Sequence, residues 1–183
     1  MLIKRITPQK YKILKALFEE SLIEDYNNAH LARCVGTLMS RGNHWPVIGI
    51  TEEALKLIKD EKFDLPKGVI QRGHLIPRSE TINLLFRNRK TFVSIEDFES
   101  IYTFYDKTVL MTREQNKSSK HTPEFIKFKS PNPETFKTSY IGFKYEEEEK
   151  SFLKDLYKEF YSKPLRLHSI RDIYPKGLNS HLK

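Results

Sequence analysis

Apolar positions recur at helical spacing through the first third of the chain. Thr7 is a plausible N-cap and Pro8 suits a first helical position, and the apolar residues that follow at helical intervals are Ile13, Leu14, Leu17 and Phe18. A second helix is predicted over residues 22–39, and a third begins at Thr51 in TEEALKLIKDEKF, where the first turn is acidic. The intervening SRGNHWPVIG is predicted to be a loop. Residues 1–63 are therefore expected to be helical.

The pattern then changes to strands separated by helices. VIQRGH (69–74) begins with β-branched residues and runs into a proline turn, which predicts a strand ending at His74. A short basic helix is expected over 79–89. Ser94 with Asp97 forms a capping-box pattern before SIEDFESIYTFY, and DKTVLMT (106–112) predicts a second strand. Thr112 with Gln115 repeats that pattern before TREQNKSSKH. The predicted order is strand, helical insertion, strand, helix.

The last third combines a Pro-rich aromatic stretch with one amphipathic helix. Residues 122–144 carry the aromatics, with a strand predicted at SYIGFKY, and EEEEKSFLKDLYKEFY (146–161) places its apolar residues on one helical face. A basic tail begins at Lys163. We expect an α+β fold with a helical N-terminal region (1–63), a central core (64–122) and a C-terminal extension (123–183).

Charge favours a polyanionic partner. The chain has 183 residues and a formal net charge of +8, a balance common among nucleic-acid-binding proteins. No apolar run is long enough for a membrane span, and the first residues lack the apolar core of a signal peptide. Cys34 is the sole cysteine, so an intrachain disulfide and a cysteine-based zinc site are excluded, and we expect Cys34 to be buried. We predict a cytoplasmic protein without membrane association.

His74 is the most promising chemical group, because it lies at the mouth of a strand between two arginines. A histidine is largely neutral near pH 7 and can accept a proton from water as a general base. Phosphodiester hydrolysis also needs a divalent cation, and Mg²⁺ prefers oxygen ligands and keeps several waters. Asn116 is a candidate ligand, since it lies in the first turns of the helix after the second strand.

The stretches GHLIPRS and DKTVLMTREQNKSSK resemble the ββα-metal core of HNH endonucleases. The family pattern has an Asp-His pair, Ile-x-Pro-x-Ser, Asp-Asn-x-Val-Leu, and a helix with Asn before a basic residue. The matching residues here are His74, Ile76, Pro77, Ser79, Asp106, Val109, Leu110, Asn116 and Lys117. The Arg-Gly-His run is also similar to the Asp-Arg-Gly-His motif of non-specific nucleases. The resemblance covers about residues 67–121.

The resemblance implies a divalent-metal-dependent endonuclease acting on double-stranded DNA. His74 would activate water, with Arg72 as a second catalytic residue, and Asn116 would help to hold Mg²⁺ or Mn²⁺. Phosphates would be contacted by Arg72, Arg78, Lys117 and Lys120, because guanidinium and ammonium groups bind phosphate. Small proteins of this family act in restriction, phage defence or homing. The sequence leaves open whether the chain forms a homodimer.

Departures from the family pattern, among them a long helical insertion between the two strands, keep other functions open. Gly73 stands where a metal ligand usually precedes the catalytic histidine, and Gln71 replaces the leading Asp of the Arg-Gly-His branch. The middle Asn, which orients the histidine, falls on Asp106 or Lys107, and only Asp106 has the carboxylate for that role. A non-catalytic nucleic-acid-binding module with a degenerate HNH core is therefore the alternative, and a protein-interaction domain is a third.

Overall fold

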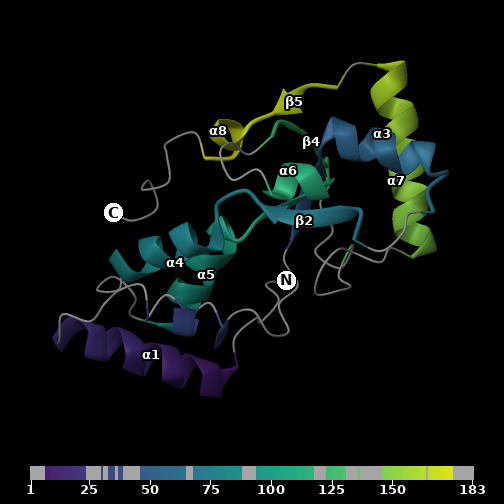
Figure 1. Cartoon of the computed structure of the whole chain (residues 1–183). Coiled ribbons are helices and arrows are strands. Elements are labelled where there is room, and N and C mark those ends of the chain that lie inside the picture. The colour runs from purple at the N-terminus through teal and green to yellow at the C-terminus, as the bar shows by residue number, and fades with distance from the viewer. Residues whose placement is uncertain are drawn as a thin grey trace. The chain divides into compact units, whose positions relative to one another are not determined.

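The computed structural model describes residues 7–23, 30, 33–35, 37–38, 46–64, 68–87, 94–117, 123–130, 136, 146–163 and 165–174. These residues form two compact units, each assembled from separate parts of the chain. The helical unit contains α1 (Pro8–Ile23), α4 (Arg78–Arg87) and α5 (Ile95–Tyr105), and the sheet unit contains the strands (Figure 1). The chain is thus α+β, as expected, and the sheet unit includes residues 47–60 from the predicted N-terminal helical region.

The helical unit follows its sequence signals closely. The Lys10 N–H donates to Thr7 Oγ1 at 3.2 Å at the start of α1, and Ser94 with Asp97 forms the predicted capping box of α5. Its core comprises Leu14, Val35, Ile82, Leu85 and Tyr102. The prediction that Cys34 is buried is wrong. Cys34 is exposed, and its neighbour Val35 is the residue that is buried in this core.

The sheet unit contains a mixed five-stranded sheet in the order β2-β3-β1-β4-β5. The strands are β1 (Val47–Ile50), β2 (Ile70–His74), β3 (Thr108–Thr112), β4 (Phe125–Lys127) and β5 (Leu167–His168). Strands β1 and β3 run parallel, and the other neighbouring pairs are antiparallel. The loop prediction for 40–49 is therefore wrong over 47–49. All four residues of β1 are buried, so the strand lacks the polar alternation that would have revealed it.

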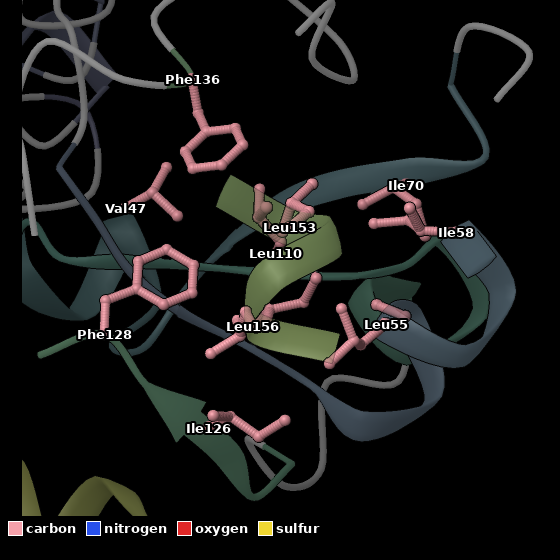
Figure 2. Close-up of a cluster of buried hydrophobic side chains, with 12 residues drawn as sticks. Val47, Leu55, Ile58, Ile70, Leu110, Ile126, Phe128, Phe136, Leu153 and Leu156 are labelled. Carbon is pink, nitrogen blue, oxygen red and sulfur yellow. The ribbon is translucent and has the colours of Figure 1, made fainter. Parts of the chain in front are cut away.

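One face of the sheet packs against α3 (Glu52–Asp60) and α7 (Glu147–Ser162), the predicted amphipathic helix. Figure 2 shows Leu55 from α3 and Leu153 and Leu156 from α7 converging on the strand residues. The labelled strand residues of this cluster are Val47, Ile70, Leu110 and Ile126. Each buried leucine or isoleucine contributes about 1.5–3 kcal/mol relative to exposure, so this cluster is the main core of the unit.

The opposite face carries a second, smaller core and two short helices, α6 (Arg113–Lys117) and α8 (Ile170–Ile173). Its buried residues are Ile48, Leu75, Val109, Met111 and Phe125, with Ile173 of α8 packed against them. Successive side chains of a strand point to opposite faces, so Val109 and Leu110 enter different cores. Both faces of β3 are thereby covered. The predicted strand SYIGFKY lies outside the described residues.

Candidate functional site

Strands β2 and β3 form an antiparallel pair, and α6 follows β3 without a break. The register runs from Ile70 opposite Thr112 to His74 opposite Thr108. The Leu75 N–H donates to the Lys107 carbonyl at 3.0 Å, which closes the pair at the point where the chain leaves for the helical unit. The predicted order of strand, helical insertion, strand and helix is confirmed.

A glutamine fixes the start of α6. Gln115 Oε1 accepts from the Thr112 N–H at 3.1 Å, and the Gln115 N–H donates to Thr112 Oγ1 at 3.2 Å, which is the predicted capping box. The same side chain also accepts from Thr51 Oγ1 at 2.8 Å and donates to Glu53 Oε2 at 2.9 Å. Gln115 therefore ties α6 to the N-terminus of α3, a role that the local sequence pattern did not indicate.

Asn116 lies over β2 at Gly73. Its Nδ2 atom donates to Gln71 Oε1 at 2.7 Å, and a Cβ atom at position 73 would lie 2.9 Å from Asn116 Oδ1. The same Cβ would lie less than 3 Å from Sδ and Cε of Met111. Gln71 and Gly73 share one face of β2 because they are two residues apart. Glycine at position 73 therefore leaves room for the tips of the Met111 and Asn116 side chains, and Figure 1 shows α6 beside β2.

His74 is the last residue of β2, and its side chain has a different environment from that of Asn116. Strand alternation directs its side chain to the face opposite that of Gly73 and Asn116. The residue is half-buried, and its Nε2 atom is buried. Its cross-strand partner Thr108 is fully buried and donates through Oγ1 to the Pro46 carbonyl at 3.0 Å. The side chains of His74 and Asn116 therefore lie on opposite faces of β2.

Arg72 has a structural contact that the sequence did not indicate. Its Nη1 atom donates to the Phe136 carbonyl at 3.1 Å, and the Phe136 N–H donates to Glu149 Oε1 at 3.0 Å. Phe136 is fully buried and has a φ of 56°, which a non-glycine residue rarely adopts. These two bonds hold Phe136 between β2 and α7. The use of Arg72 in catalysis or phosphate binding stays a prediction.

The other predicted residues belong to different parts of the chain. Arg78 begins α4 in the helical unit, and its side chain lies outside the described residues, as does all of Lys120. Lys117 is exposed at the end of α6. Asp106 is buried at the C-cap of α5, where its N–H donates to the Tyr102 carbonyl. The described part of the chain has no cluster of three histidine, cysteine, aspartate or glutamate side chains suited to a metal.

Lys107, the residue before β3, has an amine whose pKa is shifted by its surroundings. Burial lowers the pKa of its amine, and the nearby positive charge of Lys127 lowers that pKa further. Its Nζ atom also lies 5.1 Å from the centre of the Tyr174 ring, a cation–π distance. Two lysines are therefore held near one another at the start of β3 and the end of β4.

A cavity of about 380 Å³ lies between β4, α7 and β5, on residues that the sequence did not single out. Its lining combines apolar side chains with charged side chains of both signs. The lining residues are Ile126, Lys127, Phe128, Lys129, Ser130, Phe152, Asp155, Leu156, Glu159, Leu165, Arg166 and His168. A volume of this size is typical of small-ligand sites.

Comparison of the chain with protein-family models, with curated proteins and with solved structures gives no match. Within the described ranges, none of the helices has both the length and the apolar character needed to cross a membrane. The function of this chain must therefore be inferred from its residues and their geometry.

Proposed function

We propose that this chain is a metal-dependent HNH-type endonuclease that hydrolyses phosphodiester bonds of double-stranded DNA. The observation that carries the proposal is the contact of α6 with position 73, the residue before His74. In the family pattern this position supplies a metal ligand and the helix supplies the asparagine. Asn116 Oδ1 lies over Gly73, and this contact between the helix and the end of β2 supports the proposal.

The donors at this place fit a water-rich Mg²⁺ or Mn²⁺ site. Gln71 engages the Nδ2 atom of Asn116, which leaves Oδ1 as the amide oxygen presented over Gly73. Asn116 is exposed, so waters can complete the coordination sphere that Mg²⁺ prefers. A bound divalent ion would neutralise the charge that develops on the scissile phosphate and the leaving oxygen.

The chain's own residues would supply the proton transfer and the attraction of DNA. His74 would accept a proton from the attacking water. Its side chain lies on the face of β2 opposite Asn116 and its Nε2 atom is buried, so the end of β2 as well as the ring would have to turn toward the metal when DNA binds. Lys117, on the exposed end of α6, would contact a phosphate beside Asn116. Arg72 is a further phosphate contact in this proposal, and the enzyme would act in restriction, phage defence or homing in the cytoplasm.

A non-catalytic DNA-binding module is the second candidate, and two observations favour it. Gly73 supplies no side-chain ligand, and the Nε2 atom of His74 is buried. Such a module would retain the basic charge of +8, and its DNA affinity would fall steeply with salt through counterion release.

The test is cleavage of supercoiled plasmid by the wild type, His74→Ala and Asn116→Ala, each with Mg²⁺, Mn²⁺ or EDTA. His30→Ala is the matched control, since His30 is an exposed histidine of the helical unit. The nuclease predicts metal-dependent cutting that His74→Ala and Asn116→Ala abolish and His30→Ala retains. Absence of cutting with any metal, together with a salt-sensitive DNA shift by all four proteins, would establish the binding module instead.

A further inference from the structure

We propose that three cationic side chains in a row across one face of the sheet, Lys107, Lys127 and Arg166, bind phosphates of a DNA backbone. The row lies wholly within the sheet unit. None of the three residues is among the phosphate contacts predicted from the sequence. The inference depends on the part of the proposed function that both candidates share, namely that the chain binds DNA.

Strand alternation places Lys107 and Lys127 on the face of the sheet that carries the smaller core. Val109 and Phe125 belong to that core, and each lies two residues from one of the lysines in the sequence. The two amines are close enough for the charge of Lys127 to lower the pKa of the Lys107 amine. Lys127 is exposed, whereas Lys107 is half-buried with its amine over the Tyr174 ring. The two lysines therefore form one positive surface on this face.

Arg166 extends this positive surface to the edge strand. Ile126 pairs with Leu167 in the antiparallel β4–β5 ladder, so Lys127 and Arg166 are the next pair across the two strands. The Arg166 side chain is 72% exposed and pairs with Asp172 of α8, the helix that covers this face. A guanidinium has five N–H donors, so this ion pair leaves donors for a phosphate.

The length of the row suits a DNA backbone. Lys107 precedes β3 and Arg166 precedes β5, and the sheet order places β1 and β4 between these strands. Neighbouring strands are about 4.8 Å apart, so the row spans about 14 Å. One DNA strand presents a phosphate about every 3.4 Å along the helix axis. Several phosphates can therefore face the row at once, whereas a small anion would occupy only one end of it.

The row begins near the position proposed for the divalent ion. Val109 is opposite Gly73 in the β2–β3 pair, and Lys107 is two residues, about 7 Å, away from Val109 on the same face. Asn116 Oδ1 lies over Gly73 on that face. A DNA strand on the row would therefore lie on the side of the sheet where the metal would bind.

The experiment measures the affinity of the full chain for a labelled DNA duplex by fluorescence anisotropy, in EDTA and between about 50 and 200 mM salt. EDTA removes divalent metal and so prevents cleavage. Each phosphate contact contributes about 0.9 to the slope of log affinity against log salt concentration. We expect Lys127→Gln to lower the magnitude of this slope by about 0.9 and to weaken binding about eightfold at 0.1 M salt, equally on two unrelated sequences. Arg166→Gln should also lower the slope, and α8 keeps its cap because Asp172 stays bonded to Ser169.

Lys129→Gln is the matched control. Lys129 is an exposed lysine of the same segment, and its ammonium pairs with Glu159 of α7, the helix on the opposite face of the sheet. This variant removes the same charge from the chain and should leave the slope unchanged. Lys127→Arg should also retain the slope, because a guanidinium binds phosphate as well. The substituted side chains are exposed, so these variants are expected to fold, and circular dichroism checks this.

Three results would overturn the inference. They are equal slopes in the wild type, Lys127→Gln and Arg166→Gln, a slope in Lys129→Gln as low as that in Lys127→Gln, and absence of duplex binding by the wild type. Plasmid cleavage with Mg²⁺ tests the nuclease separately. A wild type that cuts DNA, with an unchanged slope in both glutamine variants of the row, refutes the inference alone. The expected loss of slope without cleavage by the wild type refutes the nuclease and supports the inference.

Discussion

Replacing Gly73 with alanine probes the packing of α6 against β2 directly. The added Cβ would lie less than 3 Å from the tip of Met111 and 2.9 Å from Asn116 Oδ1. Overpacking of this kind costs about 1–3 kcal/mol. Alanine is about 0.5–1 kcal/mol better than glycine inside a strand, which offsets part of that cost. The contacted atoms are the tips of two side chains, so we expect Gly73→Ala to lower the free energy of unfolding by about 0–2.5 kcal/mol, depending on how far the buried Met111 can shift.

A double-mutant cycle with Met111→Ala identifies the cause. Met111 is 3% exposed, so Met111→Ala alone should cost about 2–5 kcal/mol through the cavity that it leaves. In the double variant the methyl group of residue 73 has room where the Met111 tip was. The combined loss should therefore be smaller than the sum by about 0.5–2 kcal/mol.

Urea unfolding followed by circular dichroism measures these differences, and amide exchange of β2 and β3 assigns them to the sheet unit. A Gly73→Ala protein more stable than the wild type would refute the close packing and would contradict the position of Asn116 over Gly73. Strict additivity of the two substitutions would refute the assignment of the cost to Met111 alone.

Three further perturbations have expected outcomes. Arg72→Gln removes a charged donor from the Phe136 carbonyl and should lower the free energy of unfolding by about 1.5–3 kcal/mol in urea titrations, and Arg72→Lys should not restore it fully. Gln115→Ala removes the capping box and the link to α3, which should cost about 0.5–2 kcal/mol and speed amide exchange in α6. The folded-state pKa of Lys107 lies below its ordinary value of 10.5, so between these two values the unfolded chain binds more protons and stability should rise with pH. Urea midpoints measured as the pH approaches 10.5 from below should show that rise in the wild type and a smaller one in Lys107→Gln.

Local sequence signals predicted much of the fold. Thr51, Ser94 and Thr112 each cap a helix as expected, because a cap depends only on residues within one turn. The two strands around the helical insertion were also predicted, since β-branched runs mark them. The strands β4 and β5 have three and two residues, too few to show any period. Their existence depends on partners that lie far away in the sequence.

The sequence predicted which residues form the candidate site but not how these residues are arranged. His74 at the end of a strand and Asn116 in the following helix both follow from local patterns. The contact of Asn116 with Gln71 depends on the register of β2 and β3, which no local pattern sets across a long insertion. The bond of Arg72 to Phe136 likewise joins distant segments, so the structural role of this arginine was not foreseeable.

The central position of β1 has a consequence for how the protein folds during synthesis. Thr108, which pairs with Val47, follows it by about sixty residues, and Lys127, which pairs with Gly49, follows by nearly eighty. At about 5–20 residues per second, the ribosome needs several seconds to deliver the first partner strand. During that interval the apolar run Val47–Ile50 has neither neighbour of the finished sheet. The sheet unit of the nascent chain should therefore fold slowly, and it should depend on chaperones more than the helical unit does.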